Sequence, residues 1–130
     1  MNERFEVGGV HVPRGERRTI QIDVARLVTD TPLTMPVHVI RGHRPGPTLF
    51  VSAAVHGDEL NGVEVVRRLL ASKRLKNMRG TLLAVPVVNV FGFVNRSRYL
   101  PDRRDLNRSF PGSEKGSLAA RMANIFLEEI

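Results

Sequence analysis

The sequence contains no cysteine among its 130 residues. Disulfide bonds, thiolate metal sites and cysteine nucleophiles are therefore excluded, and packing has to hold the fold together. No apolar run approaches the roughly 20 residues of a membrane-spanning helix, and the first residues, MNERFEVGGV, lack the apolar segment of a signal peptide. From these absences we expect a cytoplasmic chain with no membrane partner.

Aromatic residues are also scarce, with six Phe, one Tyr and no Trp, so few side chains are available to stack on nucleic-acid bases. The net charge of +7 and the pI near 11.2 are compatible with a polyanionic partner, because Arg and Lys bind phosphate backbones. The alternative is a basic composition spread over a solvated surface. Because no nucleic-acid-binding module is recognisable, we rank that class last and expect no nucleic-acid partner.

The length and the apolar content of 42% are sufficient for one domain with a core. The chain is too short for two ordinary domains, so we predict a single domain over residues 1–130. The stretch from Thr48 to Gly62 is predicted to form the centre of the fold. Residues 49–55 form an apolar run interrupted only by Ser52, which is typical of a strand buried on both faces of a sheet covered by helices. Helical spacing then predicts a helix over 61–72.

The remaining patterns complete an α/β fold. Alternating apolar residues predict an antiparallel pair of strands, and a second long apolar run predicts a strand parallel to the central one through a βαβ crossover. Pro86 in that second run requires either an edge position or an end of pairing there. The predicted ranges are a surface leader (1–16), strands (19–24, 33–39), a turn (41–47), the second long strand (82–88), an ordered long loop (89–112) and a helix from Ser117.

His56 and Glu59 fall at the turn between the central strand and its helix. Ligands bind at such carboxyl ends of strands in open α/β sheets, and His and Glu are both ordinary zinc ligands. The H-x-x-E spacing alone is a weak signal, since a Glu can instead serve the helix N-terminus beside an incidental His. The buried strand, the flanking glycines and the downstream loop rich in Arg and Asn favour the interpretation as a site.

Four motifs together give the chain a family resemblance: HGDE, PVVN, SRYL and DLNRSFPG, spread over residues 45–112. The chain resembles the succinylglutamate desuccinylase/aspartoacylase family of carboxypeptidase-like zinc hydrolases. The resemblance implies a carboxypeptidase-like mixed sheet flanked by helices in three α/β/α layers, of which this chain would be the N-terminal portion. It also implies a Zn²⁺-dependent deacylase that hydrolyses the amide bond of an N-acyl amino acid, a small-molecule substrate.

The resemblance further assigns His56 and Glu59 as zinc ligands, and Asn107 and Arg108 as the residues that hold the substrate carboxylate. An Arg fork makes two charge-assisted bonds to a carboxylate, which agrees with that assignment.

Arg98 matches the arginine that stabilises the oxyanion formed when the carbonyl is attacked. Two extra residues lie between RYL and DLNR compared with the family pattern, so Arg103 and Arg104 remain alternatives for that role. The competing interpretation of all these arginines is a solvated basic loop.

The family's third zinc ligand, a His, and its general base, a Glu, have no counterpart in the sequence, whose histidines are at positions 11, 38, 43 and 56. We therefore expect weak zinc binding and no activity from these 130 residues alone. Two alternatives remain: a zinc carboxypeptidase that acts on peptides, and a metal-free module that binds a carboxylate or phosphate. The acyl group, the amino acid and the oligomeric state are not fixed by the sequence.

Overall fold

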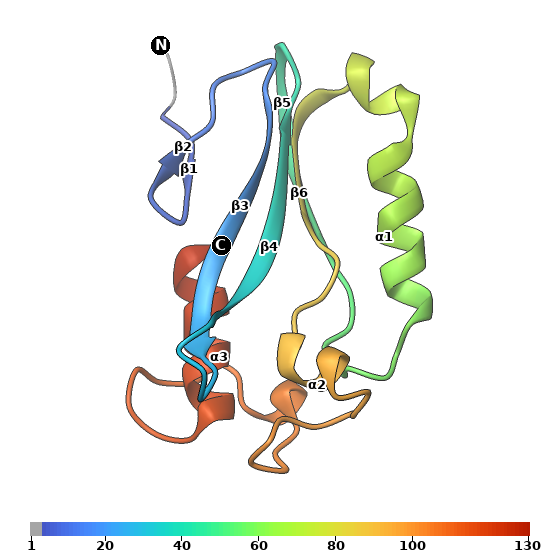
Figure 1. Cartoon of the computed structure of the whole chain (residues 1–130). Helices are drawn as coiled ribbons and strands as arrows, with labels where there is room; N and C mark the ends of the chain where they lie inside the picture. Colours follow the sequence, from blue (N-terminus) through green and yellow to red (C-terminus); the bar gives the residue numbers. More distant parts are fainter. Residues whose placement is uncertain (1–3) are drawn as a thin grey trace.

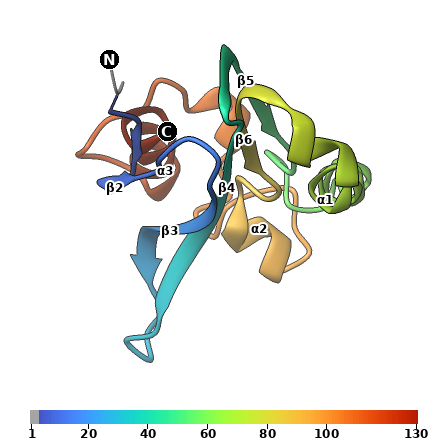
Figure 2. The same ribbon diagram turned by 90° about the horizontal axis from the view of Figure 1, so that it is seen from above.

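The structure, a computed structural model, describes residues 4–130 (Figure 1). Within them, a four-stranded sheet in the order β3-β4-β6-β5 has α1 on one face and α3 on the other, which confirms the predicted mixed sheet flanked by helices (Figures 1 and 2). Its strands are β3 (Arg17–Arg26), β4 (Pro32–Arg41), β5 (Arg44–Ser52) and β6 (Arg79–Val85). The helices are α1 (Asn61–Ala71), α2 (Val90–Val94) and α3 (Leu118–Glu129), with 3-10 turns η1 (Lys73–Asn77) and η2 (Leu106–Arg108).

Strands β3 and β4 form the predicted antiparallel pair, each a few residues longer than the alternating pattern indicated. Ile20, Ile22 and Val24 are buried while their neighbours along β3 face solvent, as alternation requires. The buried side chains join apolar residues of β4, β6 and α3 in the larger of two core clusters.

The β5–α1–β6 segment is the predicted crossover, because β5 and β6 pair in parallel with Leu49 opposite Leu82. Val66 and Leu70 of α1 pack on this part of the sheet in the second core cluster. Strand β6 lies between β4 and β5 and ends at Val85, one residue before Pro86. Of the two explanations for Pro86, an end of pairing is therefore correct, since proline has no N–H to donate.

The prediction that residues 49–55 are buried on both faces is wrong for this chain. Strand β5 is an edge strand, and the side chains of Leu49 and Phe50 are 60% and 41% exposed. Within residues 4–130, β6 pairs with one side of β5 and no strand pairs with the other. The strand also begins earlier than predicted, so residues 44–47 belong to it and the predicted turn shrinks to 42–43.

Two other predictions are corrected. The predicted surface leader contains a small antiparallel ribbon, β1 (Glu6–Val7) and β2 (Val10–His11), and it buries Val7 and Val12 in the core; residues 1–3 lie outside the described range. The long loop at 89–112 is ordered, as predicted, but contains the short helix α2 and the turn η2. Both elements begin at a polar capping residue. They are too short to show the apolar periodicity by which a helix is recognised in a sequence.

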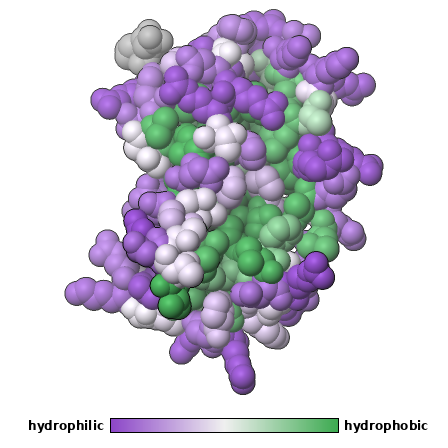
Figure 3. Space-filling model, in the orientation of Figure 1, coloured by the Kyte–Doolittle hydropathy of each residue, from purple (hydrophilic) through white to green (hydrophobic). Residues whose placement is uncertain are grey.

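The last helix begins where the sequence predicted, because the hydroxyl of Ser117 accepts a hydrogen bond from the backbone N–H of Ala120 at 3.1 Å. On the face drawn in Figure 3, apolar surface remains exposed between the sheet and α1. Val63, Leu70 and Pro86 contribute to a hollow there of about 410 Å³. Within residues 4–130, no helix is both long and apolar enough to cross a membrane.

Candidate active site

The turn that carries His56 is tied to the exit of the neighbouring strand. Beyond the end of β5, the backbone N–H of Asn89 donates to the carbonyl of Ala54 at 2.9 Å, and that of Val88 donates to the carbonyl of Ala53 at 3.0 Å. Ala54 has a φ of 52°, a left-handed conformation that is uncommon for a residue other than glycine. His56 is thereby held at the carboxyl ends of β5 and β6, where the sequence placed a site, and is 7% exposed.

Gly57 allows this turn to lie directly against α2. A Cβ atom at position 57 would lie 2.0 Å from the carbonyl carbon of Gly92 and 2.3 Å from the amide nitrogen of Phe93. Both are backbone atoms, so a side chain at position 57 cannot be accommodated by a rotamer change.

Gly57→Ala is expected to destabilise the fold by about 1–3 kcal/mol, the usual cost of overpacking, because the turn has to move away from α2. Thermal unfolding followed by circular dichroism measures the change. Asp58→Ala is a suitable control, since it changes the next residue of the same turn, whose side chain is exposed. Equal unfolding temperatures for Gly57→Ala and the wild type would contradict the close contact.

The imidazole of His56 lies between two carboxylates. Its Nδ1 is 3.0 Å from Oε1 of Glu59, and its Nε2 is 2.9 Å from Oδ1 of Asp105. Burial of the ring opposes protonation, but the hydrogen bonds and negative charges of Asp105 and Glu59 outweigh it, so the pKa of His56 is raised. The structure therefore brings together the two predicted ligands and adds a carboxylate to which the sequence analysis gave no role.

Asp105 is itself held by its own segment. Its Oδ1 accepts a hydrogen bond from the backbone N–H of Asn107 at 2.9 Å, which caps η2, and its carbonyl accepts from the hydroxyl of Ser109 at 2.9 Å. Burial disfavours the charged carboxylate, but the bonds from His56 and the Asn107 N–H prevail and the pKa of Asp105 is lowered. The sequence signal was available, since Asp105 opens the DLNR motif at an N-cap position.

Arg98 also reaches this cluster. Its guanidinium lies 3.4 Å from Oε1 of Glu59 and 3.9 Å from Oδ2 of Asp105. The buried amide of Asn89 supports the segment, since its Oδ1 accepts from the Gly92 N–H at 2.9 Å and its Nδ2 donates to the Arg98 carbonyl at 3.5 Å. Asn89, in the PVVN motif, is therefore a second residue whose positioning role the sequence analysis did not assign.

The two alternatives to Arg98 do not reach this cluster by any contact among the described residues. Arg104 is exposed and pairs with Asp102 at 3.8 Å, and Arg103 is exposed with a left-handed φ of 62°. Asn107 and Arg108 lie on η2, directly after Asp105, and their side chains are exposed. Their side chains are two hydrogen-bond donors that lie next to the cluster and are accessible to solvent.

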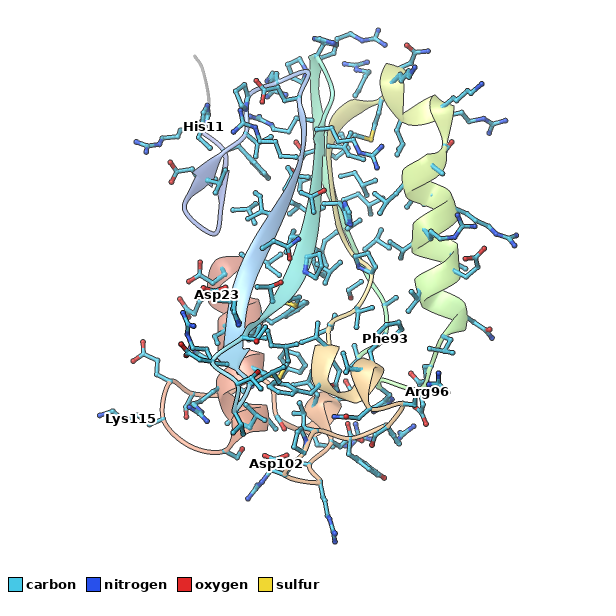
Figure 4. The ribbon with its side chains drawn as sticks, viewed as in Figure 1. His11, Asp23, Phe93, Arg96, Asp102 and Lys115 are labelled. Carbon is cyan, nitrogen blue, oxygen red and sulfur yellow. The ribbon has the colours of Figure 1, made fainter. Side chains whose placement is uncertain are left out.

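The other histidines lie elsewhere. His11 is on the β1–β2 ribbon, whereas Phe93, Arg96 and Asp102 lie at the end of the molecule where β5 and β6 terminate (Figure 4). His38 is on β4 next to the Thr19 hydroxyl, and the ring of His43 lies over Gly15. Within residues 4–130, no group of three or more His, Cys, Asp or Glu side chains is arranged to hold a metal ion.

The geometry of His56 and Glu59 nonetheless fits a shared zinc ion. Zinc bonds to nitrogen and oxygen are about 2.0–2.2 Å long, so two ligands of a tetrahedral ion lie about 3.4 Å apart. Nδ1 of His56 and Oε1 of Glu59 are 3.0 Å apart and need to separate by only a few tenths of an ångström. Asp105 is on the opposite side of the ring, where a carboxylate orients a metal-bound histidine instead of ligating the same ion.

Comparisons with known proteins identify relatives of this chain. The N-alpha-acetyl-L-2,4-diaminobutyric acid deacetylase of Halomonas elongata is 33% identical over 93 residues, which are 71% of this chain and 27% of that protein. A succinylglutamate desuccinylase/aspartoacylase structure from Rhodobacter sphaeroides superposes with a TM-score of 0.77 at 26% identity, over 88% of this chain and 36% of that one.

A product-bound structure of the ectoine utilization protein EutE (DoeB) from Ruegeria pomeroyi gives a TM-score of 0.74 at 30% identity, over 86% of this chain and 35% of that one. The chain thus spans between 27% and 36% of the length of these relatives. The family model for the succinylglutamate desuccinylase/aspartoacylase catalytic domain matches residues 45–129, which include every candidate site residue. The chain belongs to the succinylglutamate desuccinylase/aspartoacylase family, of whose catalytic domain it is a part.

Proposed function

We propose that this chain supplies one part of the active site of a zinc-dependent amidohydrolase that removes the acyl group from an N-acyl amino acid. The position of the His56 ring carries the proposal: Nδ1 faces Glu59 at ligand spacing, while Nε2 is fixed by Asp105. A carboxylate behind a metal-binding His sets the tautomer and orientation of the ring.

The substrate class follows from the relatives and from the exposed donors. The curated relative is a deacetylase of an N-acetylated amino acid, and the family acts on acyl amino acids. Such substrates carry a free carboxylate next to the amide. Asn107 and Arg108 offer an amide donor and a guanidinium fork directly beside Asp105, which suits the recognition of that carboxylate.

In the proposed reaction, each side chain of this part of the site has a distinct task. His56 and Glu59 hold the metal, and Asp105 keeps the His56 ring in its ligating orientation. Arg108 and Asn107 bind and orient the substrate carboxylate, while Arg98 donates to the oxygen that becomes negatively charged when the amide carbonyl is attacked. A zinc ion held here supplies Lewis-acid polarisation of the carbonyl and activates water near neutral pH.

A zinc titration of the purified chain tests the proposal without an activity assay. The wild type is expected to bind zinc weakly, because residues 4–130 supply two ligands to an ion that prefers four. His56→Ala should abolish measurable binding in isothermal titration calorimetry. His43→Ala is the matched control, since that ring lies against Gly15, away from the cluster, and should leave the affinity unchanged.

Equal zinc affinities for the wild type and His56→Ala would remove His56 from the metal site. That result would favour the metal-free alternative, in which the basic loop holds a carboxylate or phosphate ligand. Loss of binding in the His43→Ala control would instead show that zinc binds at a different place.

A further inference from the structure

The positive charge of the chain is concentrated at one end of the molecule. Nine of its 20 Lys and Arg residues, but one of its 13 Asp and Glu residues, fall in residues 13–18, 41–47 and 72–80. These segments include the start of β5 and follow the end of α1, both of which lie at the end of the molecule opposite to α2 (Figure 1). The basic composition is therefore not spread evenly over the surface.

Hydrogen bonds between the three segments fix this end of the fold. The N–H of Gly42 donates to the carbonyl of Gly80 at 2.8 Å, which joins the turn after β4 to the start of β6. The guanidinium of Arg17 donates to the carbonyl of Leu70 at 2.8 Å, which joins the start of β3 to the last turn of α1. Residues far apart in the sequence are thus held side by side.

A hollow of about 280 Å³ opens between these segments, and its lining combines apolar and basic side chains. The carboxylate of Glu16 also lines the hollow, but it is paired with Arg18 at 2.7 Å. The hollow therefore has an excess of positive charge above an apolar surface. The apolar lining residues are Ile40, Leu70, Ala71 and Leu75, and the basic ones are Arg17, Arg41, His43, Lys73 and Lys76.

Part of this charge has a structural use, because cations stabilise the C-terminus of a helix such as α1. Arg17 does so through its bond to Leu70, and Arg41 is buried and donates to the carbonyl of Val12 at 2.8 Å. Lys73 and Lys76, in contrast, are exposed. They are three positions apart on η1, where such side chains lie on the same side of the turn. A bound anion would relieve the repulsion between the two ammonium groups.

We propose that this hollow is a binding site for a small phosphate monoester. The phosphate contacts Lys73, Lys76 and the ring of His43, and the carbon skeleton lies on the apolar lining. A doubly charged phosphate suits two ammonium groups better than a single carboxylate does, and lysine is a common phosphate ligand. The volume is just below the usual range for ligand pockets, about 300–1,000 Å³, so the ligand is small.

This hollow is separate from the candidate active site. Strand β5 begins beside it and ends just before His56, and its nine residues span roughly 25 Å at about 3.3 Å per residue. The proposal therefore concerns a second site and does not depend on zinc binding or on hydrolysis.

Titration of the purified chain with phenyl phosphate, followed by the amide signals in NMR spectra, tests the site. We expect shifts at Gly42, His43 and Lys73, and none at Asn107 and Arg108 in the candidate active site. Inorganic phosphate lacks the apolar body, and benzoate lacks the second negative charge. Each should bind at least about fivefold more weakly than phenyl phosphate.

Variants at the surface make the test specific. Lys73→Ala and Lys76→Ala should each weaken the binding of phenyl phosphate by at least about fivefold, because each removes a charge-assisted contact. Lys115→Ala removes the same charge from the exposed loop before α3, toward the other end of the molecule, and should leave the affinity unchanged (Figure 4). Unchanged amide signals within β4 verify that each variant is folded.

Four results would overturn the proposal. The first is a set of shifts centred on residues 105–108, which would place the anion in the candidate active site. The second is an affinity that neither lysine variant changes. The third is equally tight binding of inorganic phosphate or benzoate. The fourth is tighter binding of a short single-stranded DNA at this end at physiological salt, which would make a nucleic acid the ligand. None of these measurements involves zinc, so the proposed function is tested independently.

Discussion

Replacing Arg98 by alanine is expected to lower kcat by about 10²–10³-fold in a catalytic domain completed to the length of the relatives. The guanidinium of Arg98 already lies 3.4 Å from Oε1 of Glu59, which is paired with His56. A donor at that position interacts most strongly with the negative charge that develops on the carbonyl oxygen. Its loss therefore reduces the rate of the chemical step.

Arg108→Ala is expected to act differently, mainly by raising KM, because a contact to the substrate carboxylate is made equally in the ground and transition states. Steady-state hydrolysis of N-alpha-acetyl-L-2,4-diaminobutyric acid measures both variants. Arg98→Lys should restore little, since lysine keeps the charge and loses the planar fork. A silent Arg98→Ala together with a large loss of kcat in Arg103→Ala or Arg104→Ala would transfer the role to the inserted residues.

Asp105→Ala is expected to weaken zinc binding by about 10–100-fold, the usual effect of removing the carboxylate behind a metal-binding histidine. The bond between Oδ1 of Asp105 and Nε2 of His56, at 2.9 Å, fixes the ring so that Nδ1 faces Glu59. Without that bond the ring can rotate, and the free energy needed to fix its orientation then weakens zinc binding. Calorimetric titration of the isolated chain measures the change.

Asp58→Ala is the matched control for this variant. It removes the same charge from an exposed position two residues after His56, and the zinc affinity should stay close to that of the wild type. Asp105→Asn keeps an acceptor oxygen but removes the negative charge, so an intermediate affinity is expected. If Asp105→Ala and Asp58→Ala weaken binding equally, the contribution of Asp105 is general electrostatics and not ring orientation.

Most elements of the fold were predictable because their signals are local. The alternation in β3 and β4, the helical spacing of α1 and the Ser117 cap each depend on residues close in sequence. The exposure of β5 was not predictable. An apolar run indicates that both faces of a strand are suited to burial, but it does not indicate whether the elements that would bury them are part of the chain. The apolar side chains of Leu49 and Phe50 are correct for a central strand and are found here at an edge.

The candidate site was predictable in part. His56, Glu59 and Arg98 follow from short motifs, and the structure brings them together. The contact between His56 and Asp105 joins residues 49 positions apart, so no spacing rule predicts it. The support that Asn89 gives to the Arg98 segment is also a tertiary effect, since it requires the chain after α2 to return to Asn89.

The connectivity of the sheet has a consequence for the order of folding. Strands β3 and β4 are joined by a short turn at residues 27–31 and form a local hairpin, whereas β5 and β6 pair only after α1 has crossed between them. Pairings between distant parts of a chain form more slowly than local ones, because loop closure costs entropy first. The turn that holds His56 is formed by the slower pairing. During refolding, the hairpin should therefore acquire amide protection first, and zinc binding should appear only when β5 and β6 have come together.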